Sequence, residues 1–416
     1  MPTQVGVSAV SEPRILFLVQ GYPPVFGGGA LTLSLIRSSI ARRGVESMVL
    51  TGNRGIEGGR QPGVCRLPSL GSEAYPRIDA FLFALMVVPM LVALHRRYDV
   101  IHTMGKEWSV YVAILVGRVL GKPVIVSSVQ NRCDDPAGIL RERFGRAKNA
   151  IFARASRYSC LSSLQLEAYR KAAYPDDKVR FIPNGMDPSR FRPCESPGAR
   201  AALRERLGLP REGFLTVSVG AIVYRKGIDL LAEAWTNFQR AGGRGTLVLV
   251  GPDRASEPGG GVDDAFVASI RERLASAALA ESVVFAGRVA NVQDYLRAAD
   301  VFALVSRGEG GVPQALLEAM ATQLPFLVWD LPDYRGYDLK DGIHGHLVPP
   351  FDTTRLAERL GALASSVELR EKMGRAARAH ASEFTFDRNA ASHMALYREV
   401  AAGRRTGGER PAVQGS

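Results

Sequence analysis

The segment Ser306–Ala321 combines a strand end, a glycine loop and a helix start, and it constrains the fold of this chain more than any other stretch. The apolar run Val301–Val305 just before it predicts a short, buried parallel strand. Three glycines follow, including Gly310 and Gly311, and their small size lets the backbone approach a ligand closely. This order of elements is typical of an α/β domain that binds a ligand at the carboxyl end of its sheet.

The helix after this loop adds an anion site. Pro313 suits the first turn of a helix, and Gln314–Thr322 continues with helix-forming residues. Unpaired N–H groups at a helix start, together with the helix dipole, attract a bound anion. Glu318 lies about one turn inside the helix, where its carboxylate can accept hydrogen bonds from ribose hydroxyls but would repel phosphate. The segment therefore indicates a nucleotide sugar, although an ordinary strand–loop–helix crossover is an equal alternative for this stretch alone.

The rest of the chain repeats the order of strand, loop and helix, and its 416 residues suffice for two cores of ordinary size. Apolar strands are predicted at 14–19, 47–50, 100–102, 124–129, 158–161 and 179–182, and again at 214–219, 246–250, 283–285, 301–305 and 326–329. Helical segments between them imply parallel sheets covered on both faces. The expected fold class is therefore α/β, with two doubly wound Rossmann-like domains facing a cleft.

The domain boundary is expected at Phe191–Pro197, where two prolines break regular structure. This boundary gives an N-terminal Rossmann-like domain over 14–193 and a C-terminal one over 194–385. The ends of the chain, 1–13 and 402–416, are polar and contain Gly and Pro, so we expect them to be disordered tails.

The net charge of +12 limits the class of partner. Polyphosphate ligands, an anionic membrane surface and nucleic acid each explain such a charge. No helix-turn-helix, zinc-finger or RNA-binding aromatic signature accompanies it, so we expect no nucleic acid. Cys65, Cys133, Cys160 and Cys194 lie far apart, which favours buried thiols of a cytosolic protein over a disulfide framework. No basic segment leads into an apolar one before Ile15, so no signal peptide is expected and the predicted location is cytoplasmic.

Two segments raise the question of a membrane surface. The apolar run Ala80–Leu94 is too short to span a bilayer, which needs roughly twenty residues, so a buried helix against a parallel sheet is the favoured interpretation. The stretch 138–155 predicts a helix with five basic residues among Phe144, Ile151 and Phe152. Such a helix either meets anionic lipid or, more commonly, is a solvated face with a few core contacts. Peripheral association with the inner face of a membrane is therefore a weaker prediction.

A second loop, residues 220–227, follows the first predicted strand of the C-terminal half and opens its helix. A cation at this point can neutralise a diphosphate leaving group. Lys226 is the candidate, with Arg225 as its neighbour. A solvated turn is the alternative for this dipeptide taken alone.

Neither a metal nor an organic cofactor is predicted. His344 and His346 lie close together but lack a third ligand, and there is no D-x-D pair. The loop at 21–29 lacks the G-x-G-x-x-G spacing of dinucleotide binders, which argues against a nicotinamide or flavin site. No G-x-S-x-G nucleophile elbow is present.

Six motifs in this order make the chain resemble the retaining glycosyltransferases of family 4, which have the two-domain GT-B fold. The resemblance extends from about residue 14 to residue 400. The motifs are Tyr22-Pro23-Pro24 with Gly27-Gly28-Gly29, Asp99–His102, Ile182–Asp187, Arg225–Leu231, the pair Glu309 and Glu318, and Gly342–Pro350. No single motif is specific, but six in sequence are strong evidence together.

The resemblance implies a metal-independent enzyme that moves a sugar from a UDP- or GDP-linked donor to a glycan, a glycolipid or a small-molecule acceptor. The N-terminal domain would bind the acceptor, and the last helix, 386–401, would cross back onto that domain. The donor site would comprise Gly28, Gly29, Arg225, Lys226, Glu309, Gly310, Gly311, Val312 and Glu318.

The same resemblance implies a role for each of these residues. Gly28 and Gly29 would lie close to the donor phosphates, which Lys226 would bind. Glu309 and the following residues up to Val312 would hold the transferred sugar and the adjacent phosphate, and Glu318 would hold the ribose. Lys226 and Glu309 are the catalytic candidates.

The chain departs from the family pattern at two points. Ala221 stands where the family usually has Arg, and eight residues separate Glu309 from Glu318 instead of seven. A transferase is the favoured interpretation. The alternatives are a catalytically weakened nucleotide-sugar binder and, less favoured, a sugar-nucleotide isomerase on the same fold.

Overall fold

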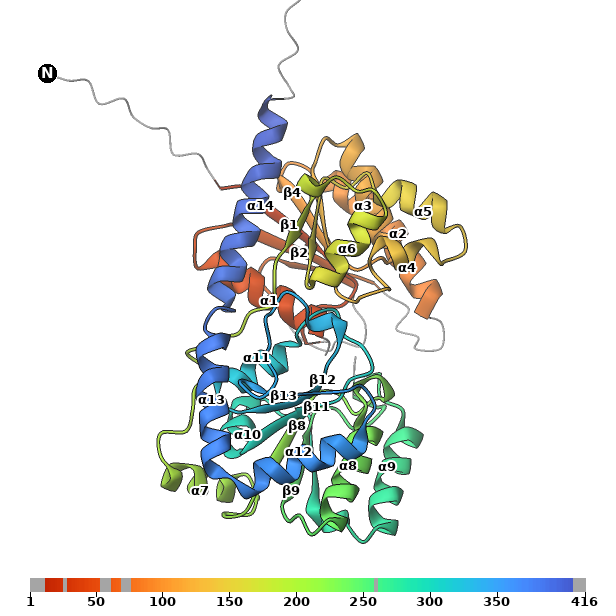
Figure 1. The fold of residues 1–416 in the computed structure, drawn as a ribbon. Helices are drawn as coiled ribbons and strands as arrows, with labels where there is room; N and C mark the ends of the chain where they lie inside the picture. The colour runs from red at the N-terminus through yellow and green to blue at the C-terminus, as the bar shows by residue number, and fades with distance from the viewer. Residues whose placement is uncertain (1–11, 25–27, 53–60, 69–75, 258–260, 407–416) are drawn as a thin grey trace, which may run out of the picture.

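Two parallel β-sheets, one in each domain, lie one above the other in Figure 1. The computed structural model describes residues 12–24, 28–52, 61–68, 76–257 and 261–406. The N-terminal sheet has the strand order β3-β2-β1-β4-β5-β6-β7, and the C-terminal sheet has the order β10-β9-β8-β11-β12-β13. All of these neighbours pair in parallel. The predicted α/β class with two doubly wound Rossmann-like domains is confirmed.

The elements have the following bounds. The strands are β1 (Ile15–Leu18), β2 (Ser47–Gly52), β3 (Val64–Leu67), β4 (Val100–Met104), β5 (Val124–Ser127), β6 (Arg157–Cys160), β7 (Val179–Phe181), β8 (Leu215–Val219), β9 (Thr246–Val250), β10 (Val283–Gly287), β11 (Val301–Leu304), β12 (Phe326–Trp329) and β13 (Gly345–Val348). The α-helices are α1 (Gly28–Ala41), α2 (Pro76–Ala93), α3 (Trp108–Val119), α4 (Pro136–Leu140), α5 (Gly145–Phe152), α6 (Ser163–Lys171), α7 (Pro197–Arg206), α8 (Ile228–Arg240), α9 (Asp264–Ser276), α10 (Val292–Ala298), α11 (Gln314–Ala321), α12 (Thr353–Ser365), α13 (Val367–Ala381) and α14 (Phe386–Thr406). Short 3-10 turns are η1 (Asp176–Lys178), η2 (Tyr224–Lys226), η3 (Ala280–Ser282) and η4 (Pro332–Tyr334).

Helices cover both faces of the N-terminal sheet. Leu16 and Leu18 of β1 belong to a core that includes residues of α2 and α3, whereas Ile15 and Phe17 belong to a core with α1 and α14. Successive side chains of a strand point to opposite faces, so a sheet covered on both sides needs an apolar residue at every position. This requirement explains the continuous apolar runs that the sequence shows at the strands.

The chain passes between the domains twice, at adjacent points. Ile182 packs in the core of the N-terminal domain, and Met186 already packs in that of the C-terminal domain. Met186 forms a parallel bridge with Thr385, so the two crossing segments lie side by side. After the second crossing, α14 packs against α1 of the N-terminal domain, as Figure 1 shows on its left side.

Phe191 is buried in the core of the C-terminal domain, five per cent exposed. The guanidinium group of Arg297 donates hydrogen bonds to the carbonyls of Arg190 and Arg192 and holds this segment against α10. The crossing therefore lies on the amino-terminal side of the expected break at Phe191–Pro197.

Several elements depart from the sequence prediction. The sequence does not predict β3, β13, α7 or α12. The stretch 138–155 is not one helix, because Phe144 has left-handed backbone angles (φ 60°) between α4 and α5. Residues 402–406 continue α14 and are not part of a tail. Residues 12–13 are not part of a tail either, because Pro13 is buried and the Glu12 carboxylate pairs with Arg398. The rest of the predicted tails, 1–11 and 407–416, lies outside the described residues.

Candidate functional site

The loop after β8 presents the two predicted cations. It passes through Ala221 and the turn η2, and ends at Gly227, where α8 begins. Gly227 has φ 68°, and a Cβ there would lie 2.0 Å from the carbonyl oxygen of Val305. Only glycine fits this point, because backbone from the end of β11 occupies the space. The loop is thereby fixed against the neighbouring strand end, and Arg225 and Lys226 lie in its turn η2.

The loop after β11 brings Glu309 to these cations. Lys226 Nζ lies 2.5 Å from Glu309 Oε1, and an Arg225 guanidinium nitrogen lies 3.3 Å from Glu309 Oε2. The side chains of Lys226 and Glu309 are only 14% and 10% exposed, whereas that of Arg225 is 46% exposed. Lys226 and Glu309 thus form a largely desolvated pair, in which electrostatic interactions are stronger than at an open surface. The structure brings both predicted catalytic residues together.

A second ion pair ties the two loops together, and the sequence analysis missed it. Arg307 donates to both carboxylate oxygens of Asp229 at 2.8 and 2.6 Å, and its guanidinium lies 3.7 Å from the ring centroid of Tyr224. The Arg307 N–H also donates to the Arg225 carbonyl at 2.8 Å. Burial opposes ionisation of Asp229, but the Arg307 hydrogen bonds and charge outweigh it and lower the pKa of that carboxyl. The only sequence signal was the place of Asp229 in the first turn of α8.

The glycines after Glu309 pack against the N-terminal domain. A Cβ at Gly310 would lie 1.7 Å from the carbonyl oxygen of Val129, and one at Gly311 would lie 2.4 Å from that of Leu161. Val129 and Leu161 follow β5 and β6, so the carboxyl ends of the two sheets meet at this loop. These glycines are therefore required for close approach of the two domains, in addition to any role toward a ligand.

The first glycine loop lies at the same place. Gly28 is the first residue of α1. A Cβ at Gly29 would meet only a Val129 methyl group, at 3.8 Å. Val129 is therefore a neighbour of both Gly29, in the N-terminal domain, and Gly310, in the C-terminal domain. Gly27, also part of the first motif, lies outside the described residues.

Asp333, which the sequence analysis did not single out, connects Glu309 to the N-terminal domain. Asp333 Oδ1 accepts a hydrogen bond from the Glu309 N–H at 3.2 Å and from the Asn131 side-chain amide at 2.6 Å. Asn131 follows β5, and its own Oδ1 accepts from the Ser162 hydroxyl at 3.0 Å. Asn184 likewise donates from its amide to the Val312 carbonyl at 3.0 Å. The position of the Glu309 loop thus depends on contacts from both domains.

Glu318 lies within α11, the helix that follows the Glu309 loop. Its carboxylate is buried and accepts a hydrogen bond from the Gln314 side chain at 2.8 Å. Burial raises the pKa of Glu318 to about 7, against the opposing effects of that hydrogen bond and of the Arg190 charge. Pro313 occupies the N-cap position of this helix, not its first turn as predicted, and makes no side-chain cap.

The raised pKa of Glu318 predicts a pH-dependent stability. The folded state binds this proton more tightly than the unfolded state, so the free energy of unfolding should fall as pH rises from about 4.5 to about 7. Glu318→Gln removes this effect and should gain roughly 1–3 kcal/mol relative to the wild type across that interval. Denaturant unfolding of both proteins from pH 5 to pH 8 measures the difference. A difference that stays constant with pH would contradict the prediction.

Among the described residues, no group of three or more His, Cys, Asp and Glu side chains is placed to hold a metal ion. His344 stacks on His380 with ring centroids 4.5 Å apart. His346 Nδ1 lies 3.0 Å from Asp341 Oδ1. His344 and His346 thus contact other side chains within the C-terminal domain.

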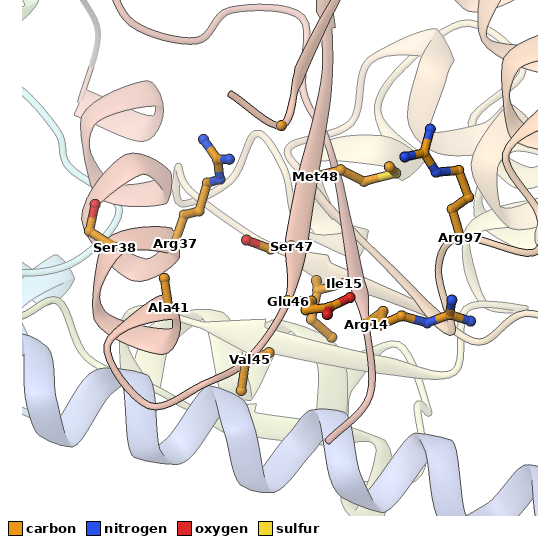
Figure 2. A pocket seen from close by; sticks show the side chains of 11 residues that line it. Arg14, Ile15, Arg37, Ser38, Ala41, Val45, Glu46, Ser47, Met48 and Arg97 are labelled. Carbon is orange, nitrogen blue, oxygen red and sulfur yellow. The ribbon is translucent and has the colours of Figure 1, made fainter. Parts of the chain in front are cut away.

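A cavity of about 580 Å³ lies at the other end of the N-terminal sheet, near the amino ends of β1 and β2 (Figure 2). Figure 2 shows Arg37 on one wall and Arg14 and Arg97 across from it. Arg14 pairs with Asp99 at 3.0 Å, and Arg37 donates to the Pro62 carbonyl at 2.8 Å. These contacts occupy two of the three guanidinium groups, and the cavity is far from the glycine loops along the strands.

The carboxyl ends of the strands of the two doubly wound domains face each other, and the C-terminal domain carries two neighbouring cations there. This is the arrangement of the GT-B fold. A family model described as glycosyl transferases group 1 matches residues 213–366, and one described as a glycosyl transferase 4-like domain matches residues 27–185. Together the two models cover most of both domains. The two matches together identify the chain as a glycosyltransferase of the GT-B type.

Individual relatives match parts of the chain. The D-inositol 3-phosphate glycosyltransferase of Streptomyces griseus subsp. griseus is 31% identical over 226 residues, which are 53% of this chain and 46% of the relative. The chain thus spans about half of the length of that relative. The alpha-D-kanosaminyltransferase of Streptomyces kanamyceticus is 24% identical over 315 residues, 72% of this chain and 76% of that one.

A solved structure shows the same fold. The structure of HepE from Anabaena in complex with UDP and glucose covers 93% of this chain and 100% of its own, with a TM-score of 0.73 and 19% sequence identity. At this identity the likeness establishes the fold.

Proposed function

We propose that the protein is a retaining, metal-independent glycosyltransferase that uses a nucleotide-diphosphate sugar as donor. The observation that carries the proposal is the convergence of Lys226 and Arg225 on Glu309 at the carboxyl ends of β8 and β11. Doubly wound domains bind their ligands at such strand ends. A diphosphate placed there meets two cations and the start of α11, all of which favour negative charge.

The donor competes with Glu309 for the cations. Glu309 neutralises Lys226, so a diphosphate group that takes Lys226 releases Glu309 to accept hydrogen bonds from the sugar hydroxyls. The buried carboxylate of Glu318 is the ribose partner, since ribose hydroxyls donate hydrogen bonds. The UDP in the HepE complex supports a uridine donor, and a guanosine donor is the other option.

Transfer proceeds on one face of the sugar. The bond between the anomeric carbon and the diphosphate oxygen breaks, the acceptor oxygen bonds to that carbon on the same side, and the acceptor proton goes to the departing diphosphate. Double displacement would need a free carboxylate against the anomeric carbon, as in retaining glycosidases. Glu309 is not the proposed nucleophile, because a carboxylate that the donor has displaced from Lys226 is assigned to hydrogen bonds with the sugar hydroxyls.

Product NMR tests this proposal. Nucleotide sugars are first screened for thermal stabilisation of the protein, because a ligand that binds only the folded state raises its stability. The stabilising donor is then incubated with candidate glycan, glycolipid and small-molecule acceptors, and the anomeric configuration of the product is determined. We expect the configuration of the donor to be retained. An inverted product, or a trapped glycosyl adduct on Glu309, would contradict the mechanism.

The N-terminal domain is the proposed acceptor side, since the charged residues of the donor site lie on the C-terminal one. All four cysteines are free thiols, which fits the reducing conditions of the cytoplasm. We therefore place the reaction in the cytoplasm, with a glycan, a lipid-linked sugar or a small molecule as acceptor.

Turnover is expected to continue in the presence of a chelator. The positive field on the leaving diphosphate comes from Lys226, Arg225 and the helix N-terminus, so no divalent ion is needed. Initial rates with excess EDTA, and again after addition of magnesium or manganese, measure this. Loss of activity in EDTA that either ion restores would contradict a metal-independent mechanism.

A catalytically weakened donor-binding protein is the second candidate. Ala221 is buried and supplies no charge, and Lys226 is already paired with Glu309. Such a protein would be stabilised by a nucleotide sugar but would release no nucleoside diphosphate with any acceptor. The stabilisation screen followed by an assay for released nucleoside diphosphate separates the two candidates.

A further inference from the structure

One side of α2 is apolar and exposed. Its large side chains recur at intervals of three and four residues, which places them in one row along the helix. They are 37% to 52% exposed and comprise Ile78, Phe81, Leu85, Val88 and Val92. The opposite side of α2 is buried in the core of the N-terminal domain. A helix that is apolar on all sides is normally buried, so we expect the exposed side of α2 to bind a partner or a membrane surface.

The exposed row continues onto neighbouring helices. Trp108, Leu115 and Val119 are exposed on α3, Val119 to 86%. The rings of Phe81 and Trp108 meet edge to face with centroids 6.4 Å apart, so the rows of α2 and α3 are continuous. Leu140 at the end of α4 and Phe144 after it extend the surface. In Figure 1, α2, α3, α4 and α5 gather on the side of the N-terminal domain away from α14.

This surface holds most of the exposed apolar bulk of the described chain. Of the fifteen large hydrophobic side chains exposed among the described residues, the ten just named lie on it. Contiguous apolar patches of this kind mark interaction sites on soluble domains. We call these ten residues the apolar face.

Basic side chains rim the apolar face. The Arg143 guanidinium lies 5.0 Å from the ring centroid of Phe144, and Lys148 Nζ lies 5.3 Å from that of Trp108. Further exposed basic residues on the same segments are Arg96, Arg118, Arg141, Arg146 and Arg154. The acidic side chains of these segments that are not buried are Glu107 and Glu142, and Glu142 lies 2.5 Å from both Lys106 and Lys148. The rim is therefore strongly positive.

We propose that the apolar face and its basic rim dock this protein on an anionic lipid bilayer. Aliphatic and aromatic side chains would enter the interface, where Trp and Phe are favoured, while arginines and lysines contact anionic headgroups. A second copy of the chain fits the apolar face less well than an anionic bilayer does, because a two-fold contact would bring two positive rims together. No helix of the described residues is long and apolar enough to cross a membrane, so docking is peripheral.

The docked surface extends to the catalytic side of the molecule. Trp108 begins α3 shortly after the carboxyl end of β4, and Phe144 immediately precedes α5, which packs against α3. The carboxyl ends of this sheet meet the Glu309 loop. A lipid-linked acceptor in the bilayer would thus be presented beside the site. This last step rests on the proposed function, whereas docking itself does not.

Vesicle sedimentation tests the docking. The full chain is mixed with vesicles of phosphatidylcholine alone or of phosphatidylcholine with phosphatidylglycerol, at low and high salt. We expect binding to the anionic vesicles that is at least about tenfold stronger than to the neutral ones and that weakens with salt. Equal binding to both vesicle types, or binding to neither, would overturn the proposal.

Matched variants locate the surface. The double change Phe81→Glu with Leu85→Glu should weaken binding to anionic vesicles about tenfold or more. The control Ile343→Glu with Val367→Glu changes two exposed apolar residues of the C-terminal domain and should bind as the wild type does. Thermal unfolding checks that both variants are folded.

Unchanged vesicle binding of the Phe81/Leu85 variant, or a wild-type dimer in solution that this variant dissociates, would overturn the proposal. Donor binding is measured without vesicles and should be the same in both variants. A wild-type protein that binds a donor but no anionic vesicles would mean that docking alone has failed, and one that binds anionic vesicles but no donor would mean that the proposed function alone has failed.

Discussion

Replacing Lys226 with alanine is expected to lower turnover by about two to three orders of magnitude, the usual scale for losing a main electrostatic stabiliser of a transition state. Ala221 supplies no charge to the donor phosphates, so Lys226 carries more of the developing diphosphate charge than in family members with Arg at that position. Arg225 is half exposed and lies 3.3 Å from Glu309, so Arg225→Ala should cost less. Steady-state rates with the donor found in the stabilisation screen measure both variants.

The Lys226→Ala effect must be separated from loss of folding. Lys226 is paired with a nearly buried carboxylate, and removal of one partner of such a pair destabilises a protein by leaving the other charge unpaired. The double variant Lys226→Ala with Glu309→Gln removes both charges and should recover stability without recovering turnover. Lys372→Ala, on the exposed side of α13, is the control for loss of one positive charge. A Lys226→Ala enzyme within a few fold of wild-type turnover would exclude the proposed role.

The sequence predicted one half of this site well. Arg225, Lys226 and Glu309 lie next to glycines at strand ends, and the strands themselves are short apolar runs between turn residues. Parallel sheets bring neighbouring strand ends together, so the β8 and β11 loops had to meet once both were recognised. The ion pair between Lys226 and Glu309 follows from that adjacency.

The other half depends on contacts that no local pattern records. Asp333 and Asn131 are 202 positions apart, and their hydrogen bond exists only because the two domains face each other. The same holds for the packing of Gly310 on Val129. A glycine next to a strand end predicts a close approach, but the sequence does not say whether a ligand or a second backbone makes it.

Errors in the fold have similar physical causes. β3 is short and only partly buried, so its sequence lacks the continuous apolar run of a central strand. The stretch 138–155 was predicted as one helix because its residues favour helix formation, and the left-handed Phe144 that divides it has no local signature. For α2 the sequence correctly predicted a helix against the sheet, but not that one side stays exposed, since its apolar residues surround the helix.

Gly310→Ala is expected to lower turnover by about a hundredfold while leaving the C-terminal domain folded. The added Cβ would lie 1.7 Å from the Val129 carbonyl oxygen and 2.6 Å from its carbonyl carbon, which belong to the other domain. Backbone cannot move aside as a flexible side chain does, so the domains must separate by on the order of 1–2 Å to restore normal contact. Such a displacement of donor-side from acceptor-side groups is enough to cost about two orders of magnitude in rate.

Gly308→Ala is the matched control, because a Cβ at that position, two residues earlier in the same loop, meets nothing within 4 Å. It should retain turnover within a few fold. The thermal unfolding of the two variants should be similar, since the clash in Gly310→Ala can be relieved by domain opening at the paired crossings near Met186 and Thr385. Small-angle scattering should show that saturating nucleoside diphosphate compacts the wild type and Gly308→Ala but not Gly310→Ala. Equal turnover and equal compaction of the two variants would mean that the contact between Gly310 and Val129 is not part of the active arrangement, and that the catalytic state has the domains further apart than they are here.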